Sequence, residues 1–493
     1  MTRASALLTI VLGLSIAGSI PPAGAQGVRG EVRLIGSWLD YPVLVRDSIP
    51  EGQVPGDGTT RRLPDGTVVS CIPGGYCYWY RSGEKQSSQR SIQDFRLTGW
   101  PGWRGVSSRL HVRGRLGSDE FWPGSSQDVQ VLNLYVDFDR SHWRLRGGRQ
   151  EKTGGLGFDH FDGLDVLWRG SDVFRVEAFA GRSLIPTALE SHTGGLLQDS
   201  DELFPDKAAT LIGVETRVRL GLDFSSSLLY QRELRTDRAG LYSERMALDA
   251  RWTRSHTTAD LSADFDVATM AFNEARLRVS RPVRSSLTLA AEGRYYRPYF
   301  DLWTIWGAFA PVGYAQAKLD MAWTVRPDLS LNAAASYRDY EETHTGLEAA
   351  PIEGDGWFSH AGADWSRGPV SLGGLVSVYR GFGAYRGAID LRAVRRWGRA
   401  DHFGLFASGT QQIAEFRFGE GVTRGAGVEG RIARGPASLD GRLGMYRHTF
   451  ENRPGFRDYS QLRGQLGLSW RFGAEPRARE QAREPITVPA GQP

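Results

Sequence analysis

The sequence predicts an all-β chain that closes into a transmembrane, antiparallel, up-and-down barrel of about 22 strands, within a range of 18 to 22. Three observations predict it. Apolar residues occupy every second position in runs of about ten residues, these runs continue from about Val28 to Phe472, and polar turns separate them. Because side chains on a strand alternate between its two faces, each run has one apolar and one polar side. A closed wall of such strands meets lipid on the outside and water on the inside.

Residues 1–25 have the pattern of a secretory signal. Arg3 precedes a short apolar run, and Ala23-Gly24-Ala25 is a small-x-small cleavage site. A membrane anchor is the alternative, but the apolar run is shorter than the roughly 20 residues of a membrane helix. No cysteine follows the expected cut, so a lipid anchor is not expected. The barrel would then occupy residues 26–472.

Residues 42–90 form the longest segment without a strand pattern and are expected to be a loop. Both cysteines of the chain, Cys71 and Cys77, lie in this segment. In an exported protein this spacing predicts a small disulfide ring, with two free thiols as the alternative. The loop is expected either to fold into the bore or to stand outside it.

The hairpin from Met246 to Val267 shows the strand pattern clearly, with two strands of about ten residues around the turn at 253–257. Comparable runs occupy residues 109–116, 132–138, 212–220, 287–295, 317–325, 439–445 and 462–472, whereas residues 91–100, 161–169 and 401–411 are weaker strand candidates. Short turns alternate with longer connections, and barrels of this kind place their tight turns on the periplasmic side.

Five tryptophans lie beside short turns or near the end of the last strand, namely Trp168, Trp252, Trp323, Trp365 and Trp470. Indole rings favour the headgroup level of a membrane, so these positions predict a periplasmic aromatic girdle. Aromatic packing in a soluble sheet is the alternative. Residues 473–493 lose the strand pattern and are expected to form a disordered periplasmic tail.

The polar side of the wall is rich in charge. Four of the 60 basic residues are lysine, so 56 are arginine, and a GC-rich genome is one explanation. A ring of arginines raises the local anion concentration and selects anions, whereas arginine–carboxylate pairs between strands would simply knit the wall together. The residues expected to line the pore are Arg109, Arg113, Arg144, Arg146, Arg217, Arg219, Arg245, Arg251, Asp260, Asp264, Arg276, Arg278, Glu292 and Arg294.

The width of such a barrel requires something inside it. Twenty-two tilted strands close into a ring about 40 Å across. No separate plug domain is expected before the first strand. An inward loop or a partner protein would therefore have to narrow the bore.

The chain resembles the outer-membrane β-barrel porins of Gram-negative bacteria. The final strand, ending LGLSWRF at Phe472, resembles the terminal signal read by the barrel assembly machinery. A narrower resemblance links WRLRGGRQE (143–151) and HFDGLDVLWRG (160–170) to the alginate-export-like porins, and it would place Arg146, Arg149 and Asp162 on the lumen side. The resemblance implies a location in the bacterial outer membrane, with membrane lipid and the assembly machinery as partners.

Two functions are expected. The first is a porin-type channel for passive or weakly selective passage of hydrophilic solutes, with anions favoured by the arginine-rich lumen. The alternative is a structural sheath that houses a periplasmic or lumen-resident partner, such as a multihaem cytochrome of an electron conduit. Neither a Ser-His-acid trio, a Walker loop nor a metal-binding Cys/His spacing is found, so an enzyme, a cofactor and a metal site are not expected. Basic residues are spread along the chain, so nucleic-acid binding is not expected.

Overall fold

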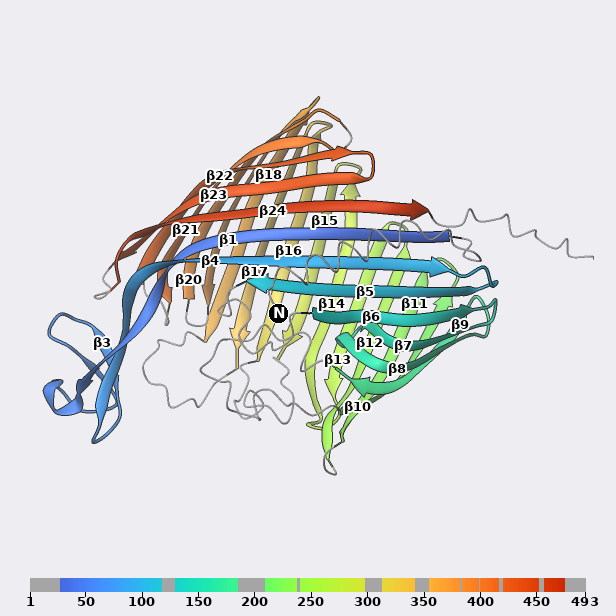
Figure 1. Ribbon diagram of the computed structural model, residues 1–493, viewed down its shortest axis with the longest axis horizontal. Helices are drawn as coiled ribbons and strands as arrows, with labels where there is room; N and C mark the ends of the chain where they lie inside the picture. Colours follow the sequence, from blue (N-terminus) through green and yellow to red (C-terminus); the bar gives the residue numbers. More distant parts are fainter. Residues whose placement is uncertain are drawn as a thin grey trace, which may run out of the picture.

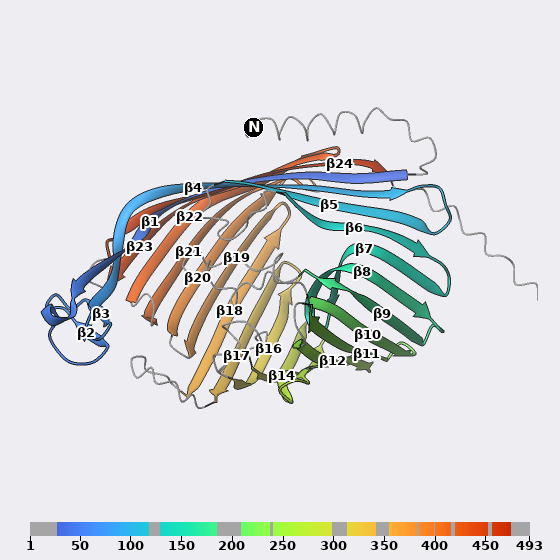
Figure 2. The same ribbon diagram turned by 60° about the horizontal axis from the view of Figure 1, so that its bottom comes forward.

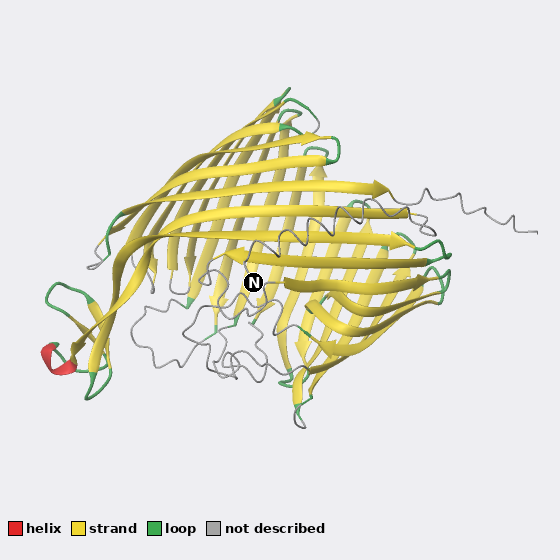
Figure 3. Ribbon diagram, in the orientation of Figure 1, coloured by secondary structure: helices red, strands yellow, loops and turns green. Residues whose placement is uncertain are grey.

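The computed structural model describes residues 27–117, 129–184, 209–236, 240–297, 313–341, 354–381, 384–398, 400–415, 420–451 and 456–474. The expected signal sequence and residues 475–493 of the expected tail lie outside the described residues. Strands dominate the described chain, and a single short helix lies at one end (Figure 3). None of the described helices has the length and apolar character that a membrane span requires.

The elements follow one another along the chain in the order of their labels (Figure 1). They are β1 (Gly27–Pro50), η1 (Glu51–Gln53), β2 (Thr60–Arg62), β3 (Val68–Cys71), β4 (Tyr76–Trp100), β5 (Val106–Gly117), β6 (Val129–Asp139), β7 (Trp143–Gly154), β8 (Gly157–Arg169), β9 (Phe174–Ser183), β10 (Ala209–Leu220), β11 (Phe224–Arg235), β12 (Leu241–Arg254), β13 (Thr257–Asp266), β14 (Ala271–Arg284), β15 (Leu287–Tyr296), β16 (Tyr314–Arg326), β17 (Leu329–Tyr340), β18 (Asp355–Arg367), β19 (Val370–Gly381), β20 (Ala384–Arg396), β21 (His402–Glu415), β22 (Glu420–Arg434), β23 (Ala437–Glu451) and β24 (Tyr459–Ala474).

The sheet closes on itself into a barrel of 22 antiparallel strands. The first strand, β1, pairs with β4 on one side and with the last strand, β24, on the other, in the register Val28↔Ala474 to Leu39↔Arg463. Figure 1 shows these two chain ends side by side, β1 in blue and β24 in red. The predicted strand number is confirmed, and the three weak candidates are strands belonging to β4, β8 and β21. Closure leaves no unpaired sheet edge along the seam, as a wall in lipid requires.

The two faces of the wall differ as the alternation predicts. Large apolar side chains such as Leu164, Leu319 and Leu466 are at least half exposed on one face, which we call the outer face. On the other face, side chains of non-adjacent strands meet. For example, the Gln231 amide of β11 donates to the Asp159 carboxylate of β8 at 2.8 Å. Side chains of non-neighbouring strands converge only on the concave side of a barrel, so this inner face surrounds the bore.

The five tryptophans expected in the girdle lie at the ends of β8, β12, β16, β18 and β24 that adjoin short turns or the last residues of the barrel. Trp168, Trp252, Trp323 and Trp470 are at least 40 % exposed. The indole N–H of Trp365 donates to Asp328 at 3.1 Å in the turn before β17. An apolar ring with a polar tip suits the boundary between acyl chains and water.

Residues 42–90 differ from the expectation of a loop, because most of them belong to two long strands. β1 and β4 continue past the barrel and pair from Gly27↔Trp100 to Pro50↔Tyr76, while β24 accompanies β1 only to Leu39. Beyond that point the two strands form a ribbon on their own that leads away from the ring (Figure 2). The ribbon strands pair only with each other there, and one contact reaches the barrel, from the Arg457 backbone N–H to the Ser82 hydroxyl at 3.3 Å. The apolar/polar alternation of a barrel strand is therefore missing there, and the sequence pattern does not reveal the strands.

The tip of the ribbon has a small core of its own. Cys71 and Cys77 form a disulfide, and the two sulfur-bearing side chains pack with Val54 and Val69. A ring this short stabilises the folded tip by about 2 kcal/mol through the entropy of the unfolded chain.

Replacing both cysteines by serine should therefore affect the tip and spare the barrel. We expect faster protease cleavage between residues 51 and 75, and an unchanged heat-induced shift in gel mobility of the folded barrel. A barrel that unfolds more easily after this double substitution would show that the tip supports the wall.

Candidate functional site in the barrel lumen

One hairpin of the wall turns into the bore. β7 and β8 pair with each other over twelve residue pairs, but β7 pairs with β6 over only six, Leu134↔Arg149 to Asp139↔Arg144. Beyond those six pairs the tip of the hairpin, residues 150–160, leaves the plane of the wall. It crosses the inner faces of β9 to β12. We call these residues the hairpin tip.

The turn of the hairpin tip packs against an apolar patch on the inner face. Leu156 forms a buried cluster with Phe161 and Phe179 and with residues of β10, β11 and β12, namely Leu211, Leu229 and Ala247. Gly155 permits this contact, because a Cβ atom at that position would lie 2.7 Å from Ala247 Cβ and 2.6 Å from an Asp249 carboxylate oxygen. The glycines at the turn thus serve the close approach of backbone to wall.

Hydrogen bonds hold the same turn to β11 and β12. Asp159 accepts from the Gln231 amide at 2.8 Å, and an Arg245 Nη1–H donates to the backbone oxygen of Leu156 at 3.3 Å. Arg245 also pairs with Asp264 of β13. These contacts join the hairpin tip to parts of the wall about 70 to 90 positions away in the sequence.

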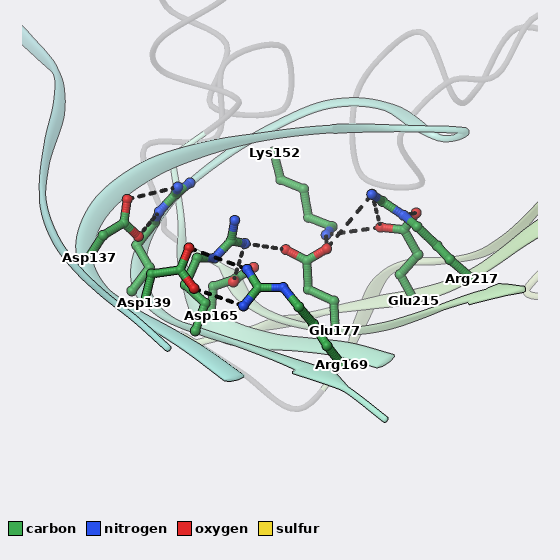
Figure 4. Close-up of polar contacts among 10 residues, drawn as sticks. Asp137, Asp139, Lys152, Asp165, Arg169, Glu177, Glu215 and Arg217 are labelled. Atoms are coloured by element: carbon green, nitrogen blue, oxygen red, sulfur yellow. Dashed lines mark hydrogen bonds and ion pairs between the residues drawn. The ribbon is translucent and has the colours of Figure 1, made fainter. Parts of the chain in front are cut away.

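Lys152 connects the hairpin tip to two carboxylates of the wall beneath it (Figure 4). Its Nζ lies 3.0 Å from a Glu177 oxygen and 3.1 Å from a Glu215 oxygen. All three side chains are nearly buried, with exposed fractions of 9 %, 10 % and 5 %. Charges removed from water in this way are stable only while they remain paired.

Arginines extend this ion-pair network along the wall (Figure 4). Arg144 lies between Asp165 at 3.0 Å and Glu177 at 2.9 Å. Arg217 binds Glu215 in a two-pronged contact of 2.7 and 2.9 Å. We call Lys152, Arg144, Arg217 and their carboxylate partners the latch.

The predicted lumen residues lie on the inner face, and most of their charges are paired. Eight of the eleven predicted arginines contact carboxylates. For these eight, the alternative interpretation fits, in which arginine–carboxylate pairs between strands stabilise the wall. The pairs are Arg113–Asp94, Arg144–Asp165, Arg146–Asp137, Arg217–Glu215, Arg245–Asp264, Arg251–Asp260, Arg278–Glu292 and Arg294–Glu274. Arg109, Arg219 and Arg276 form no salt bridge in the described part of the chain. Arg276 donates to the Ser262 hydroxyl at 3.2 Å and lies within electrostatic reach of Asp249.

The expected lumen positions of Arg149 and Asp162 are wrong, whereas Arg146 lies inside. Arg146 faces Asp137 across the ladder, but Arg149 is opposite Leu134, an exposed residue of the outer face. Arg149 pairs with Asp162 at 2.7 Å on that face. Arg149 follows Arg146 by three positions, and an odd spacing on a strand puts side chains on opposite faces.

A cavity of about 920 Å³ lies between the hairpin tip and the inner faces of β9 to β14. Thr153, Gly154 and Gly155 form its edge on the hairpin side. Its lining includes six arginines, Arg175, Arg217, Arg219, Arg251, Arg276 and Arg278. The lining also includes four carboxylates, Asp172, Glu215, Asp249 and Asp260. Arginines outnumber carboxylates in the lining, and Arg175, Arg219 and Arg276 form no salt bridge among the described residues.

Sequence reasoning missed the hairpin tip as a functional element. The segment Gly154-Gly155-Leu156-Gly157 is glycine-rich, but no α/β pattern surrounds it, so it does not predict a phosphate site. What could have signalled an inward turn is the combination of a glycine pair with Lys152, one of only four lysines in the chain. Nothing in the local pattern shows where such a turn would pack.

No family model and no curated protein sequence matches the chain. Solved structures do show likeness. OpdK of Pseudomonas aeruginosa, crystallised with vanillate, is 11% identical with a TM-score of 0.40 over 91% of this chain and 99% of the other. OccAB1 of Acinetobacter baumannii is 10% identical with a TM-score of 0.39, over 92% and 100%. An anion-selective porin from Comamonas acidovorans is 14% identical with a TM-score of 0.32, over 54% and 90%.

The wall itself establishes what kind of protein this is. In a closed antiparallel barrel the backbone N–H and C=O groups of every strand bond to neighbouring strands. This is required in lipid, because no water is present there to bond them. Its outer face is apolar, its inner face is charged, and tryptophans mark the end with short turns. The chain is therefore a 22-stranded β-barrel protein of the bacterial outer membrane.

Proposed function

We propose that the barrel is a passive channel for hydrophilic solutes, with a preference for small anions. The observation that carries the proposal is the cavity beside the hairpin tip, where six arginines and four carboxylates line a water-accessible space. Three of these arginines, Arg175, Arg219 and Arg276, form no salt bridge among the described residues. Unpaired guanidinium groups in a narrow, low-dielectric bore concentrate anions and repel cations.

The hairpin tip supports the same proposal by narrowing the bore. An open ring about 40 Å across would pass large solutes. The hairpin tip covers the inner faces of four strands, β9 to β12, and directs solutes past the arginine-lined cavity. In this proposal the hairpin tip narrows the bore, which residues 42–90 would have done under the first of the two alternatives considered for them.

Conductance of the purified barrel in planar bilayers tests the proposal. We expect stable ohmic steps, and in a KCl gradient a reversal potential displaced toward that of chloride. Changing Arg175, Arg219 and Arg276 together to Gln should move the reversal potential toward zero, since it removes three of the six positive charges of the lining and leaves its four carboxylates in place. Arg281→Gln is the matched control, because Arg281 lies opposite Leu289 on the outer face.

The absence of current at all voltages would contradict the proposal that the barrel is a channel. If a second protein then copurifies with the barrel, the sheath for a periplasmic partner becomes the better account, since a wide bore can house one. If the barrel conducts but the triple substitution leaves the reversal potential unchanged, the proposal of a channel stands and the proposal of an anion preference is wrong.

A further inference from the structure

Two arginines face each other on the outer face of neighbouring strands near the seam of the barrel. Arg424 of β22 is directly opposite Arg447 of β23 in the ladder, and Figure 1 shows these strands beside the last strand, β24. Val428 and Leu443, four positions away along each strand, are exposed on the outer face. An even spacing keeps side chains on one face of a strand, so the lipid-facing surface carries two like charges. We call these two residues the arginine pair.

The described part of the chain leaves the arginine pair without a counter-charge. Neither guanidinium group forms a salt bridge, a hydrogen bond or a ring contact with a described residue, and both side chains are exposed. The Asp458 carboxylate, two positions before the residue opposite Arg447, accepts the Phe450 backbone N–H at 3.1 Å. Like charges directly opposite one another in a ladder destabilise the sheet. An anion from outside the chain would relieve this repulsion.

The register places the arginine pair at the headgroup level of the outer leaflet. Ala437, at the start of β23, is opposite Trp470 of the tryptophan girdle. Arg447 follows Ala437 by ten positions, and about ten tilted residues cross the apolar layer of a bilayer. The tryptophans mark the short-turn end, which in barrels of this kind is periplasmic. The arginine pair therefore lies on the cell-surface side of the membrane.

The surroundings of the arginine pair match an amphiphilic anion. Met445, two positions toward the bilayer centre from Arg447 on the same face, is 62 % exposed. Ser460 of β24 is opposite Arg447 and brings a hydroxyl group to the same level. Gly409 of β21, opposite Arg424, leaves the other flank without a side chain. A polar row above an apolar surface corresponds to a lipid, whose anionic headgroup adjoins its acyl chains.

We propose that Arg424 and Arg447 form a binding site for a phosphate group of an outer-leaflet lipid. One phosphate bridges the two guanidinium groups through charge-assisted hydrogen bonds, and the Ser460 hydroxyl donates to the same group. The acyl chains of the lipid lie against Met445 and the apolar side chains below it. The bound anion replaces repulsion with attraction, so the lipid joins β22 to β23 beside the seam. The site does not depend on the proposed channel, because it lies on the opposite face of the wall.

Lipid binding to the detergent-solubilised barrel, counted by native mass spectrometry, tests this site. The probes are lipid A with two phosphates, the same glycolipid without phosphates, and inorganic phosphate. We expect lipid A to bind at least about tenfold more tightly than its dephosphorylated form, as charge-assisted hydrogen bonds allow. Inorganic phosphate has no acyl chains to bury, so its displacement of lipid A should require about a hundredfold higher concentration.

A double substitution separates the site from general attraction to a basic barrel. Arg424→Gln with Arg447→Gln should weaken the binding of lipid A at least about tenfold and leave that of the dephosphorylated lipid unchanged. Arg281→Gln with Arg395→Gln is the matched control, because it removes two arginines from the outer face at the short-turn end. The control variant should bind lipid A as the unaltered barrel does.

The repulsion within the arginine pair provides a second readout, the temperature of the heat-induced gel shift. In neutral detergent without lipid, the Arg424 and Arg447 double variant should unfold at the temperature of the unaltered barrel or above it, since it loses a repulsion. Lipid A should raise the unfolding temperature of the unaltered barrel, because it binds the folded state. It should not raise that of the double variant.

Equal affinity of lipid A for the unaltered barrel and for the folded double variant would overturn the lipid site. Equal binding of the two glycolipids would overturn it as well. Displacement of lipid A by an equal concentration of inorganic phosphate would also contradict it, because the arginine pair would then recognise free phosphate. A barrel that binds lipid A as expected but carries no current would contradict the channel alone.

Discussion

Shortening the β7–β8 hairpin is expected to raise the single-channel conductance about twofold or more. Replacing residues 152–159 by Asn-Gly joins Glu151 to His160, which already face each other in the ladder, through a turn that suits a two-residue hairpin. The hairpin tip covers four strands, or about 20 Å of a bore about 40 Å across. Removing it should therefore widen the path for ions substantially.

A matched deletion in the ribbon is the control for this experiment. Replacing residues 51–75 by Asn-Gly joins Pro50 to Tyr76, which are paired in the same way. The ribbon leads away from the ring (Figure 2). The conductance of this deletion variant should therefore stay at the value of the unaltered barrel. Equal conductance of the two deletion variants would show that the hairpin tip does not limit the flow of ions.

Loss of the Lys152 charge is expected to cost about 3 kcal/mol of stability, because it leaves buried carboxylates short of a partner. Lys152→Met keeps the length of the side chain but leaves Glu177 and Glu215 facing each other with less positive charge between them. The free energy of unfolding in urea measures the loss, and a released hairpin tip should add noise to the open-channel current. Lys152→Glu, which adds a third carboxylate, should have the larger effect.

Arg169→Gln provides the comparison for the latch. Arg169 pairs with Asp139 at 2.8 Å beside a short turn, and the Asp139 side chain is half exposed. Exposed ion pairs contribute at most about 1 kcal/mol, so this change should be mild. If the Lys152→Met barrel unfolds at the same urea concentration as the Arg169→Gln barrel, the latch does not hold the hairpin tip in place.

The strands of the wall could be predicted from the sequence because their signal is local. In the run from Leu462 to Phe472, each position meets either lipid or water, and this shows directly as alternation. The hairpin from Met246 to Val267 follows the same rule. The ribbon departs from it, because its residues face neither lipid nor the bore.

Pairing of charges could not be predicted in the same way. Alternation places Arg245 and Arg219 on the inner face, but whether a carboxylate lies beside either one depends on the register of neighbouring strands. Register gives Arg245 the Asp264 partner on β13. Arg219 receives none in the described chain and is left facing the cavity. The proposed anion preference would therefore depend on the few arginines that form no salt bridge and not on the number of arginines in the chain.

The sequence alone determined that this protein is a two-faced barrel in a membrane, which end carries the short turns, and which side of each strand meets water. These properties follow from the order of neighbouring residues, since alternation and turns act over a few positions. Only the tertiary structure decided what narrows the bore and which charges remain free. Leu156, Lys152 and Asp159 find their partners on strands far along the chain, and no local pattern encodes such distant contacts.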